Sequence, residues 1–447
     1  MGHSRPLCRG PLGDRKRVFG MPGRLMLAVT AVLVTVVALA MWGSLVMHVI
    51  DYWDGASESR REDFVAYYAA ASLVAQGLPE AIYQPEVVAE VEEAVLGRPA
   101  GRVAGLVFLN PPFVAGALQP LTGMPYGQAQ AVWFAITALA VAVAIAMLWP
   151  ELRRLPRPWG LVVALAALCS LPVFWSLLYA QLTPFVLLSW VGFYRLYVAK
   201  HEGPAGLVLA LSLVKAHLVI APLLFLIVKG RWRALGGFAA GAALFVGGSV
   251  AFVGWETTFK AYPALLIDSM NWQQEFGVNR LNMLSWSALL IRIFPDLGLT
   301  LKLSLSLLLS GLTLLTAALV WRRRDGLEDG VAPLLALAVV AMLASPHVHL
   351  QDAMVFVLPA VVLAANRKDA IGIGAVGLLL FAIPAAALGP NFAPLLLGAL
   401  LAGLMVAVGL VPLPSRVRTW LRSWFGVAGT ADRPLSPAIA CRAGNQA

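Results

Sequence analysis

Residues Leu25 to Ile50 read LMLAVTAVLVTVVALAMWGSLVMHVI, a run that contains no Asp, Glu, Lys or Arg. A helix of about 20 apolar residues crosses the hydrocarbon core of a bilayer, and this run exceeds that length. It also exceeds the roughly 7–15 apolar residues of a cleavable signal peptide. We therefore expect an uncleaved first transmembrane helix. Gln128–Trp149 and Leu299–Trp321 are comparable apolar runs.

The composition points to lipid as the main solvent of the chain. Hydrophobic residues make up 60% and charged residues only 13%, whereas soluble domains carry about 25% charged residues. Mean hydropathy is +0.80. A soluble fold of this composition would expose large apolar patches. The fold class predicted is all-α, a polytopic transmembrane helical bundle.

The net charge of +10 is explained by membrane topology. No basic face or base-reading motif accompanies the charge, so we exclude nucleic acid as a partner. Basic residues sit in short loops between apolar runs, which is the positive-inside pattern. The loop Asp51–Arg102, in contrast, holds ten of the 23 acidic residues. The three cysteines lack metal-site or disulfide spacing.

Basic clusters define the expected topology. Six follow the basic N-terminal tail: Arg153–Arg157, Arg195–Lys200, Lys229–Arg233, Arg322–Arg324, Arg367–Lys368 and Arg416–Arg422. If all are cytoplasmic, an even number of crossings joins consecutive clusters. The apolar regions between clusters are accordingly read as helical hairpins, with outside turns at Tyr179–Pro184, Lys215–His217, Ser345–Asp352 and Gly389-Pro390-Asn391. Leu106–Leu121, broken by Asn110-Pro111-Pro112, is read as a re-entrant or interfacial helix. The total is about twelve spans, with both termini cytoplasmic, in a bacterial-type inner membrane.

This topology divides the chain into three parts. Residues 1–24 form a basic cytoplasmic tail. Residues 25–411 form the transmembrane domain, with a large first extracytoplasmic loop at 51–126. Residues 412–447 form a second cytoplasmic tail, which we expect to be partly disordered because it is short and polar.

Unusual polar residues gather in the turns expected on the extracytoplasmic face. They include Asp63, Gln181, Lys215 with His217, Asn279-Arg280-Leu281-Asn282, and His347 and His349 with Asp352. Ionisable residues at membrane depth are costly and tend to be functional. Because five loops bring such groups to one face, we expect a single shared site there.

The residues alone leave structural explanations open for these positions. Lys215 could reach the bilayer interface with its long side chain. His347 and His349 could satisfy each other or bind a metal, although no third and fourth ligands are evident. The tyrosines could be interface anchors. A transporter or flippase for a lipid-linked or anionic substrate is the main alternative, although no internal repeat of the kind common in transporters appears.

Motifs in order along the chain resemble those of glycosyltransferase family 87. They are Asp63-Phe64-x-x-Tyr67-Tyr68-x-Ala70 with Gly77 and Ile82-Tyr83; Asn110-Pro111-Pro112-Phe113 with Pro120 and Trp133; Gln181; Lys215; Asn282-x-x-Ser285; and Ser345-Pro346-His347 with Asp352. The resemblance covers about Arg24 to Leu410. Family members often have Tyr-Pro-Pro, Gly-Gln and Lys-Pro where this chain has Asn110-Pro111-Pro112, Ala180-Gln181 and Lys215-Ala216.

The resemblance implies a C-type glycosyltransferase fold and a membrane enzyme of that class. It would move a hexose, with mannose expected, from a polyprenyl-phosphate-sugar donor to a glycolipid or glycan acceptor on the outer face, with inversion and without a cofactor or metal. Asp63 would be the general base. Donor phosphate would contact Lys215, His347, His349 and Arg280. Sugar or acceptor would contact Tyr67, Tyr83, Asn110, Gln181, Asn282 and Asp352.

Overall fold

The computed structural model describes residues 21–53, 63–97, 106–269, 283–323, 326–327, 330–345, 347–367, 370–386, 393–407, 410 and 414–424. These residues form helices and no strands, which confirms the all-α prediction for the described part of the chain. The first half contains α1 (Met21–Trp53), α2 (Asp63–Ala75), η1 (Pro79–Tyr83), α3 (Pro85–Leu96), α4 (Pro112–Leu118), η2 (Gln119–Gly123), α5 (Tyr126–Met147), α6 (Trp149–Leu152), α7 (Trp159–Leu168), α8 (Leu171–Leu178), α9 (Thr183–Val198), α10 (Glu202–Leu209), η3 (Ala210–Val219) and α11 (Ile220–Val228).

The second half begins with the long helix α12. It contains α12 (Trp232–Glu256), η4 (Thr257–Ala261), α13 (Tyr262–Ser269), α14 (Trp286–Ile293), α15 (Leu299–Arg322), α16 (Val331–Leu343), η8 (Leu350–Phe356), α17 (Val357–Arg367), α18 (Ala370–Gly377), η9 (Leu378–Ala382), α19 (Ile383–Ala385), α20 (Ala393–Ala407) and α21 (Ser415–Trp424). The helices labelled η are short 3-10 or π segments.

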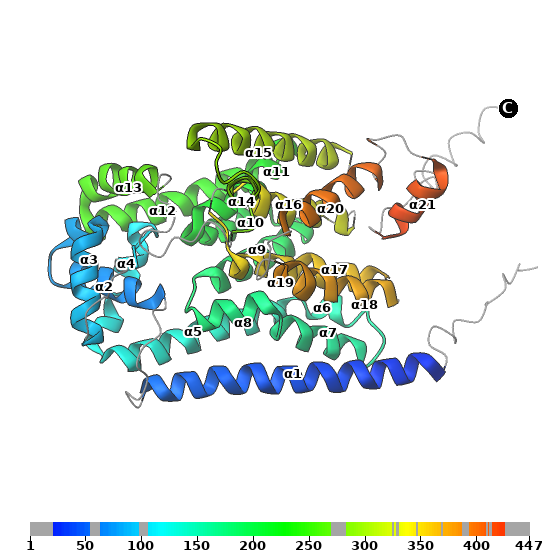
Figure 1. Ribbon diagram of the computed structural model, residues 1–447, viewed down its shortest axis with the longest axis horizontal. Coiled ribbons are helices and arrows are strands. Elements are labelled where there is room, and N and C mark those ends of the chain that lie inside the picture. The colour runs from blue at the N-terminus through cyan, green and yellow to red at the C-terminus, as the bar shows by residue number, and fades with distance from the viewer. Residues whose placement is uncertain are drawn as a thin grey trace, which may run out of the picture.

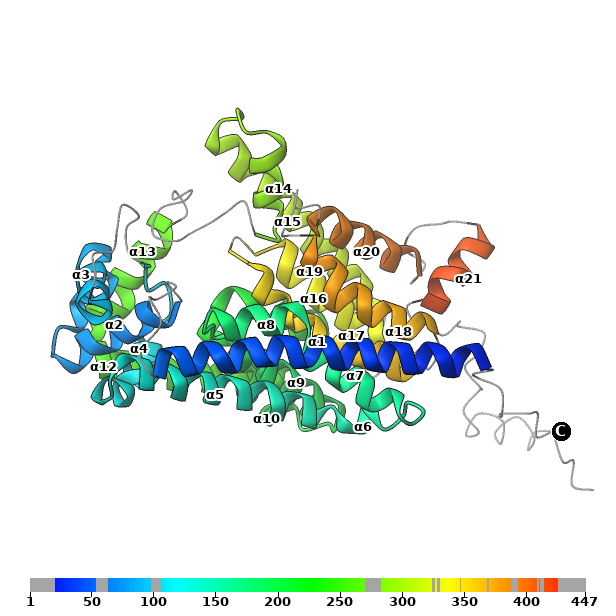
Figure 2. The same cartoon turned by 60° about the horizontal axis from the view of Figure 1, so that its bottom comes forward.

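The bundle has two distinct ends. In Figures 1 and 2, α2, α3, α4 and α13 gather at one end, and α6, α18 and α21 lie at the other, near the start of α1. Several helices, among them α1, α5 and α15, run along the long axis between these ends. α4 spans only seven residues, which is too short to cross a bilayer. The reading of Leu106–Leu121 as a re-entrant or interfacial segment stays a prediction.

Seven helical segments of the described residues are long and apolar enough to cross a membrane, and four shorter apolar helices accompany them. One of the seven, Glu202–Val228, reverses at Lys215 and is not one straight helix. The chain is thus a multi-pass helical protein by length and composition. The count of about twelve spans stays a prediction, because several expected spans are shorter than a bilayer-crossing helix. Gly389-Pro390-Asn391, one of the expected turns, lies outside the described residues.

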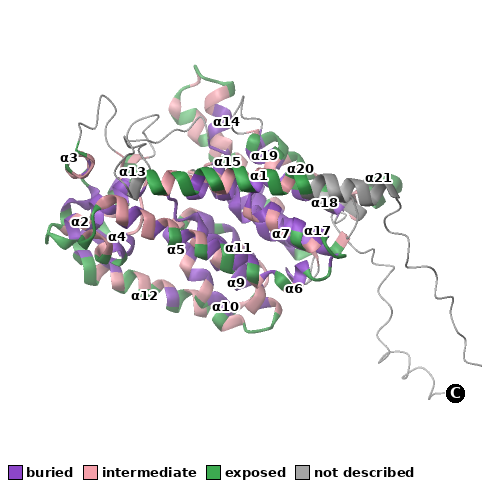
Figure 3. Ribbon diagram, turned by 90° about the horizontal axis from the view of Figure 1, so that it is seen from below, coloured by how far each residue is buried: buried purple, intermediate pink, exposed green. Residues whose placement is uncertain are grey.

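Burial separates lipid-facing helices from the core of the bundle. Few of the described residues of α1, α12 and α15 are buried, whereas α16 and α17 are almost fully buried. Figure 3 shows α1 as an exposed helix along one side, with buried helices behind it. Exposed apolar helix faces are stable only against an apolar solvent such as lipid tails.

The segment from α10 to α11 reverses direction. Arg231, just before α12, forms an ion pair with Glu202 at the start of α10, with 3.0 Å between guanidinium and carboxylate. The chain therefore leaves and returns to one end of the bundle between these residues. The reversal occurs in η3, where Lys215 has non-helical dihedral angles. This geometry agrees with the predicted hairpin broken near Lys215.

Candidate active site

Four segments far apart in the chain meet beside α2. They are the first residue of α2, the turn between α8 and α9, the kink in η3, and the first turn of η8. They contribute Asp63, Gln181, Lys215 and Asp352, which are joined by consecutive side-chain hydrogen bonds. We call these four residues the polar network. All four were candidate site residues in the sequence.

The first link of the polar network joins Asp63 and Gln181. The Gln181 amide Nε2 donates a hydrogen bond to the Asp63 carboxylate oxygen Oδ2. Gln181 follows Ala180, whose φ of 53° lies in the left-handed region that side chains rarely adopt. The turn is held by a 2.8 Å hydrogen bond from the Gln181 backbone N–H to the Ser176 carbonyl and by a 2.8 Å hydrogen bond from Trp133 Nε1 to the Ala180 carbonyl. The Gln181 side chain is therefore held in place toward Asp63.

The second link is the Lys215 ammonium group. Lys215 has φ −135° and ψ 76°, which breaks the helical course of η3. Its Nζ donates to Gln181 Oε1 at 2.7 Å and to Asp352 Oδ1 at 2.6 Å. The side chains of Lys215 and Asp352 are only 9% and 1% exposed. Lys215 is therefore a buried cation whose ammonium group is held by Gln181 and Asp352.

Asp352 closes the network against helix α9. Its Oδ1 also accepts a hydrogen bond from Thr183 Oγ1 at 3.0 Å, and its Oδ2 accepts one from the His349 backbone N–H at 2.9 Å. The last contact belongs to a reciprocal cap at the start of η8. Both carboxylate oxygens have protein donors, so Asp352 holds Lys215 in position.

Three histidines lie next to this pair. The ring centroids of His217 and His347 are 6.2 Å apart, and those of His347 and His349 are 5.0 Å apart. Burial lowers the pKa of His349 to about 4, so its imidazole is neutral at pH 7. A neutral imidazole can donate a hydrogen bond but supplies no positive charge. In the described part of the chain, no three His, Cys, Asp or Glu side chains are placed to hold a metal ion.

Tyr67 lines the network from α2. Its ring packs edge-on against Phe108 and Trp133, with centroids 6.3 Å apart in each case. Burial, followed by the carboxylates of Asp63 and Asp352, raises the pKa of the Tyr67 hydroxyl well above its ordinary value. The hydroxyl therefore stays protonated and can act as a hydrogen-bond donor near both carboxylates.

Tyr83 and Asn110 support the backbone that leads into Lys215. The Tyr83 hydroxyl donates to the Asn110 carbonyl at 2.7 Å, and Asn110 Nδ2 donates to the Val214 carbonyl at 3.2 Å. Val214 directly precedes Lys215. These contacts connect the first extracytoplasmic loop of the predicted topology to the kink in η3.

A family model for glycosyltransferase family 87 matches residues 108–346, which is more than half of the chain. The chain belongs to glycosyltransferase family 87. The expected resemblance is thereby confirmed, and family membership implies a glycosyltransferase with sugar donor and acceptor substrates. Searches of curated proteins and of solved structures gave no significant match.

The matched segment of this family 87 protein covers part of the polar network. Gln181 and Lys215 lie inside residues 108–346, whereas Asp63 and Asp352 lie outside. The assignment of Asp63 therefore depends on its own motif and on its contact with Gln181. His347 stands one residue beyond the matched segment.

Two expected site residues cannot be placed, and one contact was missed. Arg280 and Asn282 lie outside the described residues. Thr183 was not a candidate, although it stands two residues after Gln181 and binds Asp352. A hydroxyl residue at the start of a helix usually suggests a cap, so its pairing with a carboxylate 169 residues away has no local signal.

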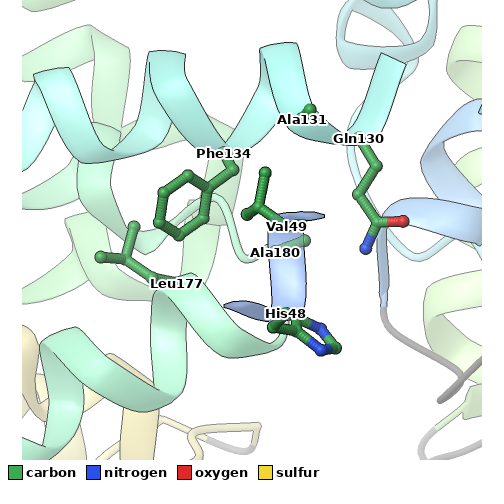
Figure 4. Close-up of a pocket in the computed structure, with 7 residues that line it drawn as sticks. All are labelled: His48, Val49, Gln130, Ala131, Phe134, Leu177 and Ala180. Atoms are coloured by element: carbon green, nitrogen blue, oxygen red, sulfur yellow. The ribbon is translucent and has the colours of Figure 1, made fainter. Parts of the chain in front are cut away.

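A small pocket lies beside the Gln181 turn, between α1, α5 and α8 (Figure 4). Its lining consists of His48, Val49, Gln130, Ala131, Phe134, Leu177 and Ala180. The lining is apolar apart from His48 and Gln130. None of the four network residues contributes to it, so this pocket borders the polar network without being part of it.

Proposed function

We propose that this family 87 protein is an integral-membrane enzyme that moves a hexose, with mannose as the first candidate, from a polyprenyl-phosphate-sugar donor. The acceptor is a hydroxyl of a lipid- or glycan-linked molecule on the extracytoplasmic face. The main support is the polar network, in which one carboxylate, Asp63, is joined to one buried cation, Lys215, through a single amide. Transfer of a sugar from a phosphate ester requires both kinds of group.

Asp63 serves as the general base in this proposal. The acceptor hydroxyl oxygen attacks the anomeric carbon, and the bond from that carbon to the phosphate oxygen breaks. The hydroxyl proton moves to Asp63, and the bonding electron pair leaves on the phosphate. A single in-line displacement of this kind inverts the anomeric centre, as in the inverting glycosidases. A positioned base accelerates such a step by about 10²–10⁴-fold.

Lys215 stabilises the departing phosphate. An ammonium group has three N–H donors, and Gln181 and Asp352 engage two of them. The third can bind a phosphate oxygen as negative charge develops there. A cation held in advance stabilises a transition state without reorganisation. His347, His349 and Arg280 are further phosphate contacts in this proposal, and His349 acts there as a neutral donor.

Sugar and acceptor hydroxyls contact the polar side chains around the polar network. Tyr67 is the best placed by geometry, since its protonated hydroxyl lies close to the carboxylates of Asp63 and Asp352. The remaining candidates are Tyr83, Asn110, Gln181, Asn282 and Asp352. The tail of the polyprenyl donor stays in the bilayer, which places its phosphate near the membrane surface.

Replacing Asp63 with Asn tests the proposal. Asn keeps the size and the acceptor oxygen for Gln181 but cannot take the hydroxyl proton. Membranes containing Asp63→Asn should transfer radiolabelled mannose from polyprenyl-phosphate-mannose about 10²–10⁴-fold more slowly than wild type. Donor binding, measured by retention of the labelled lipid on the purified protein, should be unchanged.

The matched control is Asp51→Asn, at the exposed end of α1. This variant should transfer at the wild-type rate. Wild-type transfer by Asp63→Asn would remove Asp63 from the mechanism. A wild-type protein that transfers sugar from no polyprenyl-phosphate donor would exclude the proposed donor class and favour transport of a lipid-linked substrate.

A further inference from the structure

Gln181 lies between the only two charged groups that its side chain contacts in the described structure. Its Nε2 donates to Asp63, and its Oε1 accepts from Lys215 at 2.7 Å. Gln181 itself is 3% exposed. Both ends of the amide are thus occupied by protein partners, which distinguishes it from a side chain that presents an amide to a sugar.

The chemistry of the two partners determines which way the amide points. Lysine ammonium groups only donate hydrogen bonds, and an ionised carboxylate only accepts them. The amide oxygen must therefore face Lys215, and the amide nitrogen must face Asp63. The reversed orientation would set the amide N–H groups against the ammonium and the amide oxygen against the carboxylate.

On the other side of Lys215, Asp352 connects back to α9, the helix that begins directly after the Gln181 turn. Asp352 binds Lys215 at 2.6 Å and Thr183 at 3.0 Å. Thr183 is the first residue of α9, two residues after Gln181. The contacts from Gln181 through Lys215 and Asp352 to Thr183 form a closed ring. The Lys215 ammonium group is thus held between Gln181 and the buried carboxylate of Asp352.

We propose that Gln181 is a positioning residue for Asp63. Its amide oxygen is held by Lys215, which is paired with Asp352, and its amide N–H therefore orients the Asp63 carboxylate and favours the ionised form of that base. The inference rests on the proposed function, because it assigns Asp63 as the base. It replaces a direct sugar contact of Gln181 by a role through Asp63. A carboxylate that accepts a well-aligned N–H is stabilised in its charged form.

Two substitutions separate these roles. Gln181→Glu keeps the bond from Lys215 but places a second carboxylate against Asp63. Neighbouring like charges disfavour ionisation, so the acidic limb of the pH profile of kcat/KM should move up by about 1–3 pH units. Gln181→Met removes both hydrogen bonds without adding charge. It should lower kcat about 10- to 100-fold, shift the acidic limb less, and leave the donor KM within about threefold of wild type.

A second measurement does not depend on turnover. A membrane-permeant carbodiimide modifies protonated carboxyl groups, and mass spectrometry of the Asp63 peptide reports the extent. In Gln181→Glu, the pH at which half of Asp63 is modified should rise by the same 1–3 units. Gln181→Met serves as the fallback variant if the added buried charge in Gln181→Glu prevents folding. In Gln181→Met, the pH at which half of Asp63 is modified should rise by a smaller amount.

The outcomes are distinct. An unchanged modification midpoint in both variants overturns the positioning role, even where wild-type transfer is intact. A raised donor KM with unchanged kcat and an unmoved acidic limb also overturns it and assigns Gln181 to sugar binding. A wild-type protein that transfers nothing overturns the proposed function alone, because the carbodiimide midpoint still reports whether Gln181 acts on Asp63.

Discussion

The Lys215 ammonium group is stabilised by Asp352, which is 137 residues away in the sequence. The two groups are almost completely buried. Removing one partner of a buried ion pair leaves an uncompensated charge, which is far more destabilising than replacing both partners with neutral groups. This asymmetry separates the structural role of Lys215 from its proposed role at the phosphate.

The single variant Lys215→Met should lose both stability and activity. Leaving the Asp352 carboxylate unpaired should lower the free energy of unfolding by about 3–5 kcal/mol, seen as a lower thermal midpoint in detergent. The double variant Lys215→Met/Asp352→Asn removes both charges and should regain most of that midpoint. Its transfer rate should stay low, because no cation faces the phosphate.

Lys215→Arg is the conservative control for this pair of variants. It keeps the charge and should keep part of both stability and transfer. Wild-type transfer by the double variant would show that Lys215 only balances Asp352. The proposed role of Lys215 at the phosphate would then be wrong.

The residues of the site were predictable one at a time, but their contacts were not. Gln181, Lys215 and Asp352 could be selected because polar groups in apolar surroundings are conspicuous in a sequence, whereas Asp63, one of ten acidic residues in its loop, was selected by its resemblance to the family motif. Which cation pairs with which carboxylate depends on how α9, η3 and η8 pack. The partnership of Asp352 with Lys215 and Thr183 is such a packing result, and no spacing in the sequence encodes it.

Helices α10 and α12 approach each other through glycines. A Cβ added at Gly237 on α12 would lie 2.0 Å from the Gly203 carbonyl, and one added at Gly206 on α10 would lie 1.8 Å from the Ala234 carbonyl. Close backbone approach of this kind is a common means of helix association in membranes. Because η3 follows α10 directly, this contact also positions the segment that carries Lys215.

Replacing Gly237 with Ala should therefore separate α10 from α12. Overpacking typically costs about 1–3 kcal/mol, which exceeds the gain of about 1 kcal/mol from better helix propensity. The thermal midpoint of the purified protein should fall, and transfer should fall with it because Lys215 is displaced. Gly236 is the matched control, since nothing lies within 4 Å of a Cβ added there.

Gly236→Ala should keep or slightly raise the midpoint and should leave transfer unchanged. Equal midpoints for the two alanine variants would show that the helices do not depend on this close approach. Both substitutions add one methyl group at neighbouring glycines of the same helix. The difference between their thermal midpoints therefore reports the contact with α10 and not a general effect of the added methyl group.

At the scale of elements, the sequence predicted the breaks better than the helices. The expected turn at Tyr179–Pro184 lies between α8 and α9, and the expected break at Lys215 is the kink in η3. Polar residues and prolines interrupt apolar runs visibly. Helix lengths were less predictable. α9 and α16 extend for only 16 and 13 residues, which is shorter than a typical bilayer-crossing helix. Whether they cross the membrane therefore depends on how they pack against other helices.

At the scale of the whole molecule, ion pairs bring three basic clusters to one end. Arg195 binds Glu151 at 2.8 Å, and Arg231 binds Glu202 at 3.0 Å. The clusters at Arg153–Arg157, Arg195–Lys200 and Lys229–Arg233 therefore lie at the same end of the bundle. Since basic loops favour the cytoplasmic side, we expect this end inside the cell and the end with α2 and α3 outside.

Thiol labelling in intact cells tests that orientation. Single cysteines replace Gln76 and Glu90 at the α2 and α3 end, and Arg157 and Arg233 at the basic end. All four positions are exposed. The background is a Cys8→Ser/Cys441→Ser variant, in which the remaining Cys169 is buried. A membrane-impermeant maleimide should label the first two positions and spare the last two, whereas all four should react after the cells are opened.

The pattern of labelling distinguishes particular errors. Labelling at Arg157 and Arg233 together with protection at Gln76 and Glu90 would invert the topology and place the polar network on the cytoplasmic side. Protection at all four positions would put the α2 and α3 end inside as well. Labelling at Gln76, Glu90 and Arg157 would mean that no net crossing separates α3 from α7, so that Leu106–Leu121 crosses in addition to α5. In that last case the twelve-span count would be wrong. The Arg195 cluster would then lie outside too, because the ion pair between Glu151 and Arg195 keeps both residues at one end of the bundle.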